Sequence, residues 1–114
     1  MSRDDAFLLD MLEAARLAAG YVAGKSLDDF LADVQLQDAV VRRLEIIGES
    51  ARRVSDEGRV RYPRVPWPAI IGMRNVLAHQ YDTVDLTIVW DAVHLDLPPL
   101  IAMLAALVPP DPEG

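Results

Sequence analysis

Apolar residues recur three and four positions apart along most of the chain, a spacing that places them on one face of a helix. The first such stretch predicts a helix from residue 3 to residue 20 or 22, beginning with Ser2 and Asp5 in the spacing of a capping box. Ser26 and Asp29 repeat this spacing and predict the start of a second helical segment. A long amphipathic helix is predicted over residues 36–54, and a break between residues 32 and 35 is left open.

Prolines and glycine then interrupt the helical pattern. The segment 55–58, which contains Gly58, ends the long helix, and Pro63, Pro66 and Pro68 exclude helix between residues 61 and 67. Residues 67–73 predict the first turns of a new helix, in which Pro68 takes an early position where its missing N–H costs little. One sizeable loop therefore separates the long helix from the next one.

The last apolar pattern runs from residue 86 to Val108 and predicts a final helix, with Asp82 and Asp85 as candidate caps. Pro98 and Pro99 must bend or restart this helix, and Asp96 is a candidate cap for the restarted part. Strict alternation of apolar and polar residues is absent, so the fold prediction is an all-α bundle of four or five helices.

Length and composition add limits to this picture. A chain of 114 residues with 52% hydrophobic and 25% charged residues fits one globular domain, predicted over residues 1–108 and followed by a flexible, proline-rich C-terminal tail over residues 109–114. The absence of cysteine excludes disulfides and thiolate metal sites and favours the cytoplasm. No basic and apolar leader opens the chain, and the longest apolar run has nine residues, so a soluble protein without a membrane partner is expected.

The charge is distributed unevenly. The net charge is -7, yet residues 42–74 carry eight arginines against four acids, whereas the segments before and after are acidic. This middle segment could attract phosphate locally although the whole protein is acidic. The alternative is a solvated helix face with intrahelical pairs such as Glu49 with Arg53, and the two interpretations carry about equal weight.

The candidate chemistry lies in residues 74–81, where Arg74, Asn75, His79 and Tyr81 follow one another within eight positions. On a helix, Asn75 and His79 share a face, whereas Arg74 and His79 diverge by roughly 140°. One helix therefore does not hold a single atom between Arg74 and His79. Either the second half of this segment unwinds, or a second copy of the motif supplies the missing partner.

His79 is a candidate general acid or base, because imidazole gains and loses a proton near neutral pH. The plainer interpretation is a helix-end histidine bonded to a backbone carbonyl, and it would prevail for an isolated histidine. The neighbouring Arg74 favours the catalytic interpretation, because its planar guanidinium binds phosphate and suits a proton-transferring histidine in phosphodiester chemistry. Asn75 could orient the His79 ring. His94 is interpreted as structural. Two histidines 15 residues apart make no metal-binding pattern, so no metal or other cofactor is predicted.

At these residues the chain resembles a known family. The pattern Arg74-Asn75-x-x-x-His79-x-Tyr81 is similar to the signature of the HEPN superfamily, and specifically of HepT-like ribonuclease toxins in HepT/MntA-type toxin-antitoxin systems. Further segments similar to that family span nearly the whole chain: residues 38–40, 43–49, 66–67, 70–73, 84–85, 89–90 and 96–98. The motif positions show no departure from the family pattern.

The resemblance implies an all-α HEPN-type bundle that forms a homodimer, in which the motif helices of two subunits face each other. It also implies an endoribonuclease that cleaves RNA without metal: the ribose 2'-hydroxyl attacks the adjacent phosphate, His79 moves protons, and Arg74 stabilises the developing charge. Tyr81 matches the tyrosine to which a cognate minimal nucleotidyltransferase antitoxin attaches AMP. The alternative from another functional class is a non-catalytic HEPN adaptor, or a partner that presents a nucleotide to the nucleotidyltransferase.

Overall fold

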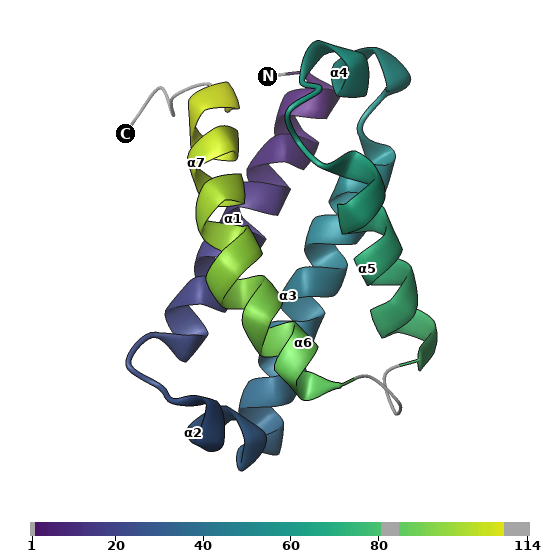
Figure 1. Cartoon of the computed structure of the whole chain (residues 1–114). Helices are drawn as coiled ribbons and strands as arrows, with labels where there is room; N and C mark the ends of the chain where they lie inside the picture. The colour runs from purple at the N-terminus through teal and green to yellow at the C-terminus, as the bar shows by residue number, and fades with distance from the viewer. Residues whose placement is uncertain (1, 81–84, 109–114) are drawn as a thin grey trace.

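The computed structural model describes residues 2–80 and 85–108, and these residues form an all-α bundle (Figure 1). Its long elements are α1 (Arg3–Val22), α3 (Val34–Arg53), α5 (Trp67–Gln80), and a composite helix of α6 (Leu86–Asp91), the π-helical η2 (Ala92–Asp96) and α7 (Leu97–Leu107). Two short helices, α2 (Leu27–Leu31) and α4 (Asp56–Arg61), lie at opposite ends of the bundle. Counting the composite helix once gives six helices among the described residues, against the predicted four or five.

Helix α3 is the central element of the bundle. It packs against α1 on one side and α5 on the other, while α7 packs against α1. The amphipathic pattern of α3 accounts for this arrangement, because its apolar stripe, which includes Val40, Val41 and Ile47, is buried in the core. The predicted tail at residues 109–114 lies outside the described residues, and the one-domain prediction stays a prediction.

The predicted caps and helix boundaries are largely confirmed. Ser2 with Asp5 and Ser26 with Asp29 each form a complete capping box, in which hydroxyl and carboxylate accept from each other's backbone N–H. The open question of a break before the long helix is also settled. Helix α2 ends at Leu31, and Asp33 caps α3 by accepting a hydrogen bond from the Leu36 N–H. Buried Gln37 fixes this corner, because its Nε2 donates to the carbonyls of Phe30 and Leu31.

The final helix was predicted to bend or restart at the prolines, and the restart was wrong. Pro98 and Pro99 occupy the first positions of α7, yet the helix neither stops nor restarts, because the π-helical segment η2 joins α6 to α7 without a gap. The wider turn of η2 changes the hydrogen-bond register just before the two residues that lack an N–H. The prediction that Asp96 caps a restarted helix was therefore wrong: its backbone is helical and its side chain caps nothing. Asp85 does cap α6, whereas Asp82 lies outside the described residues.

Helix α4 was not predicted, and a long-range contact explains how it forms. The Asp4 carboxylate accepts the Ser55 backbone N–H at 2.9 Å and the Ser55 hydroxyl at 2.6 Å. Ser55 in turn caps α4, since its Oγ accepts the Gly58 N–H at 3.0 Å. Asp4, in the first turn of α1, thereby holds Ser55, the residue that caps α4. This contact joins residues far apart in the chain, so the local sequence does not reveal it.

This contact makes a testable contribution to stability. The hydroxyl and then the backbone N–H of Ser55 hold the pKa of Asp4 below its ordinary value. Because the folded-state pKa is lowered, the stabilisation is present above the unfolded-state pKa of about 4 and is lost as pH falls through the folded-state pKa. We expect Asp4→Asn to lower Tm by a few degrees at pH 7 and by less at about pH 3.

Thermal unfolding followed by circular dichroism at the two pH values would check this expectation. Asp10→Asn, an exposed acid on the same helix, is the matched control. An Asp4→Asn deficit that is equal at both pH values would contradict the role of the ionised carboxylate.

By length and composition alone, residues 86–107 are apolar enough to cross a membrane. This is weak evidence, because a core helix of a soluble protein has the same properties. The composite helix packs against α1 and α2 and buries Val89, Val93 and Leu104. It also carries Asp91 and Asp96 on its exposed face. We therefore interpret it as a core helix.

Candidate functional site

Helix α5 carries the candidate residues, and a tryptophan fixes its start. The indole Nε1 of Trp67 donates to the Tyr62 carbonyl at 3.1 Å, and the residue is 6% exposed. The proline-containing turn before it closes with a hydrogen bond from the Trp67 N–H to the Val65 carbonyl. Pro68 is the second residue of α5, where its missing N–H breaks no helical hydrogen bond. The loop thus sets where the helix begins and which face meets α3.

The motif segment stays helical through Gln80, so the alternative that its second half unwinds was wrong. Leu77, which is 1% exposed, lies on the face toward α3, and Arg74, three residues earlier, is half-buried on the same side. Asn75 and His79 are exposed. The expected divergence of roughly 140° between Arg74 and His79 therefore stands.

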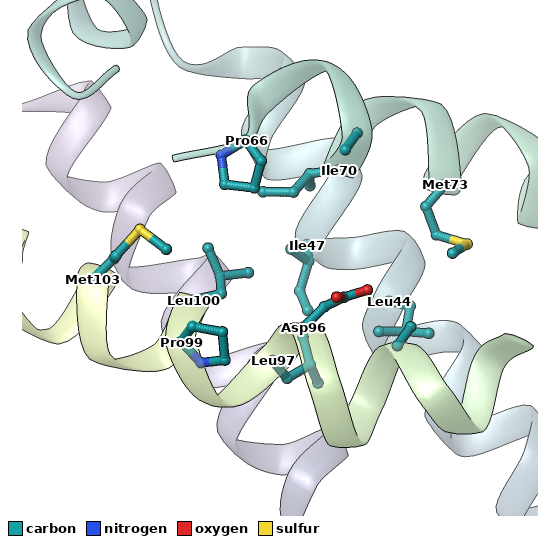
Figure 2. Close-up of a pocket in the computed structure, with 12 residues that line it drawn as sticks. Leu44, Ile47, Pro66, Ile70, Met73, Asp96, Leu97, Pro99, Leu100 and Met103 are labelled. Atoms are coloured by element: carbon teal, nitrogen blue, oxygen red, sulfur yellow. The ribbon is translucent and has the colours of Figure 1, made fainter. Parts of the chain in front are cut away.

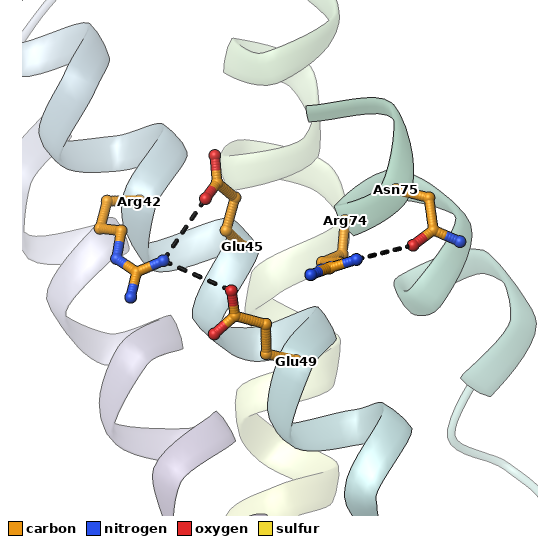
Figure 3. A network of polar contacts seen from close by, with 5 residues as sticks. All are labelled: Arg42, Glu45, Glu49, Arg74 and Asn75. Carbon is orange, nitrogen blue, oxygen red and sulfur yellow. Dashed lines mark hydrogen bonds and ion pairs between the residues drawn. The ribbon is translucent and has the colours of Figure 1, made fainter. Parts of the chain in front are cut away.

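Arg74 is held by packing and by one neighbour. Its Cβ and Cγ lie over Gly48 of α3, whose missing side chain leaves the space that they occupy. Its Nη1 donates to the Asn75 Oδ1 at 3.1 Å (Figure 3). Its Nε is buried and, within the part of the chain that the structure describes, has no hydrogen-bond partner. The arrangement fixes the stem of the side chain and leaves Asn75 bonded to Arg74. The proposed role of Asn75 toward His79 stays a prediction.

His79 lies in the last turn of α5 and is exposed. Among the described residues it makes no hydrogen bond to Arg74, so a single subunit does not join the two groups. His94 differs: its ring stacks on Trp90 with centroids 4.0 Å apart, and its Nδ1 lies 2.8 Å from the Trp90 carbonyl oxygen. These contacts agree with the structural interpretation of His94.

The eight arginines of residues 42–74 have different surroundings. Arg42 pairs with Glu45 and Glu49 at 3.4 Å each (Figure 3), so the predicted pair of Glu49 with Arg53 was wrong. Four others have no ion pair to a described residue and are exposed at the end of α3, in α4 and in the loop after it: Arg52, Arg53, Arg61 and Arg64. This end of the bundle therefore presents four arginines without ion pairs, together with the exposed acids Asp56 and Glu57.

An apolar groove of about 340 Å³ runs beside α5, between that helix and the composite helix (Figure 2). Leu44 and Ile47 of α3 line it together with Ile70 and Met73 of α5. Leu100 lines the opposite side. The groove is open because α5 packs mainly on α3. It adjoins the motif, since Met73 directly precedes Arg74.

A comparison with known protein families shows which family this chain belongs to. The family described as "Ribonuclease HepT-like" matches residues 11–107, which include the second half of α1, all of α3, α5 and the composite helix, and the motif segment. The chain belongs to the HepT-like ribonuclease family. The resemblance to this family is thereby confirmed, and the structure confirms the all-α fold.

Curated relatives agree with this assignment. The chain is 37% identical over 100 residues to the Methanocaldococcus jannaschii protein named "Putative RNase MJ1380", covering 86% of this chain and 92% of that protein. It is 36% identical over 94 residues to "Probable ribonuclease HepT" of Thermococcus cleftensis, covering 82% of this chain and 86% of that protein. No solved structure matches the chain.

Two features of this HepT-like chain bear on what its site contains. Tyr81, the candidate modification site, lies outside the described residues. Within the described residues, no group of three or more histidine, cysteine, aspartate or glutamate side chains could hold a metal ion.

Sequence reasoning missed the contribution of Gly48. A glycine in the middle of a long amphipathic helix was a usable signal, because glycine weakens a helix unless its missing side chain serves packing. The pattern did not say which partner fills the space. Only the crossing of α3 and α5 identifies that partner as Arg74.

Proposed function

We propose that this HepT-like ribonuclease is the toxin of a toxin-antitoxin pair and cleaves RNA internally without a metal ion. The observation that carries the proposal is the placement of Arg74 and His79 on α5. The first is fixed against α3 and the second is exposed at the helix end. A guanidinium and an imidazole are sufficient for phosphodiester transfer from a ribose 2'-hydroxyl.

In the proposed reaction the 2'-oxygen attacks the adjacent phosphorus, and the bond from phosphorus to the 5'-oxygen breaks. An imidazole of His79 accepts the 2'-hydroxyl proton, and an imidazolium donates a proton to the leaving 5'-oxygen. Arg74 binds the phosphoryl oxygens as charge builds on them. The products are a 2',3'-cyclic phosphate and a free 5'-hydroxyl.

A symmetric homodimer would bring these groups together. Two copies of α5 facing each other would supply two Arg74 and two His79 side chains, which one helix cannot direct at one phosphate. The apolar groove beside α5 and Val76, which is 42% exposed on that helix, support packing of a second copy at this place. The exposed arginines at the α4 end would attract the RNA backbone.

The proposal includes control by a cognate minimal nucleotidyltransferase antitoxin that attaches AMP to Tyr81. RNA as substrate implies the cytoplasm as the place of action. Tyr81 follows His79 by two residues in the sequence, so the modification would lie close to the reacting groups.

The direct test is incubation of the purified protein with cellular RNA and excess chelator. We expect fragments that end in 2',3'-cyclic phosphate, detected because a phosphatase removes the terminal phosphate only after acid has opened the cyclic ester. His79→Ala protein purified in parallel controls for contaminating ribonucleases, which leave the same ends. Cleavage that needs added divalent metal would overturn the mechanism. An inactive wild type that still binds a nucleotidyltransferase would favour the adaptor function.

A further inference from the structure

Gly48 of α3 and Arg74 of α5 meet where the two helices cross. A methyl group added at Gly48 would overlap the Arg74 Cβ, would lie 2.7 Å from its Cγ, and would lie 3.2 Å from the Ile70 carbonyl oxygen. The nearest atoms are the stem of Arg74 and the backbone of its helix, so rotation of a flexible side-chain end cannot relieve the overlap. The space beside Gly48 is therefore filled by Arg74 itself.

The glycine at position 48 is explained by this contact and not by its backbone conformation. Among the described residues, Gly24 is the only one with positive φ, so Gly48 has an ordinary helical backbone that alanine also adopts. Gly20 and Gly72, also within helices, have nothing within 4 Å of an added Cβ. Of these three helical glycines, only Gly48 is required by a close approach.

This close approach determines the surroundings of the guanidinium. It buries the Arg74 Nε, while Nη1 bonds to Asn75. Figure 3 shows the Arg74 side chain lying along α3 on the side opposite Arg42, which holds Glu45 and Glu49. A long arginine side chain is thus fixed by the surface beneath its stem before any substrate binds.

We propose that Gly48 is a positioning residue for Arg74: the missing side chain lets α5 rest on α3 and fixes the guanidinium for phosphate binding. This inference rests on the proposed role of Arg74 in RNA cleavage. Gly48 touches no substrate and acts only through Arg74. A residue with a side chain at this position would push the motif helix outward and release the arginine.

The first test is cleavage by Gly48→Ala at a temperature at which circular dichroism shows it folded. We expect kcat to fall about 10- to 100-fold with a smaller change in KM, since misplacement of a catalytic group by about 1 Å has such effects. Gly20→Ala, a helical glycine with open space, is the matched control and should keep wild-type kcat. Wild-type kcat in folded Gly48→Ala would overturn the proposal.

A double-mutant cycle separates positioning from a general structural effect. In an Arg74→Ala background, Gly48→Ala should cause no further loss of cleavage, because the group that it positions is gone. An equal fold-loss in both backgrounds would show that Gly48 acts by another route and would overturn the proposal. An inactive wild type would instead refute the proposed function.

Two measurements do not depend on activity. The Arg74 Nε–H should exchange slowly with solvent in wild type and about tenfold or more faster in Gly48→Ala, by NMR with the signal assigned from Arg74→Ala. If Gly48→Ala does not fold, Arg74→Gly, which removes the overlapping atoms, should restore folding to the double variant. Fast exchange in wild type, or no recovery of folding, would contradict the contact.

Discussion

Arg74→Ala and His79→Ala are each expected to lower the rate of RNA cleavage at least 100-fold while the helical fold persists. Loss of Arg74 removes the charge that stabilises the phosphoryl oxygens, and loss of His79 removes proton transfer. His79 is exposed, so its replacement should leave Tm nearly unchanged. Arg74 packs on α3, so Arg74→Ala should lower Tm modestly.

The measurement is single-turnover cleavage of RNA with chelator, alongside circular dichroism and Tm. Arg16→Ala, which removes an exposed cation from α1, controls for the general loss of positive charge. Undiminished cleavage by either folded variant would remove that residue from the mechanism.

Mixing the two inactive variants extends this prediction to the dimer. If each subunit contributes one essential group to the shared centre, a heterodimer of the variants still carries one Arg74 and one His79. Random exchange makes about half of the dimers mixed, so part of the wild-type activity should return. Absence of recovery after subunit exchange has been demonstrated would contradict a site shared in this way.

Modification of Tyr81 is the second prediction with a large expected effect. Co-expression with a cognate nucleotidyltransferase and ATP is expected to add one or more AMP units to Tyr81 and to abolish RNA cleavage. The added phosphate and adenine would occupy the site beside His79, pair with Arg74 and repel the RNA backbone. Intact-mass and peptide analysis would locate the AMP, and the cleavage assay would measure its effect.

Tyr81→Phe is the decisive variant, since it removes only the acceptor hydroxyl. It should keep ribonuclease activity and escape silencing by the nucleotidyltransferase. Tyr62→Phe, a tyrosine in the loop before α5, provides a control for the loss of a phenol elsewhere. Modification and inhibition of Tyr81→Phe at wild-type levels would show that Tyr81 is only structural.

The sequence by itself determined the all-α class, the two capping boxes and the helix that carries Arg74 and His79. These features depend on residues three or four positions apart, which meet wherever a helix forms. Proline positions likewise predicted where α5 begins, because a missing backbone N–H affects only the helical hydrogen bonds next to it. Arg74 and His79 were candidates for phosphodiester chemistry from the residues alone, and the family resemblance added RNA as the expected substrate and Tyr81 as the expected modification site.

Tertiary structure decided the features that join distant residues. Asp4 accepts a hydrogen bond from Ser55, the residue that caps α4. The π-helical segment η2 connects α6 to α7 just before Pro98. The Cβ and Cγ of Arg74 fill the space beside Gly48. Helical periodicity fixes which residues share a face, but it leaves open which face of another helix they meet and how closely. That choice depends on the summed packing of all the helices, so only the fold shows that Arg74 is held from α3.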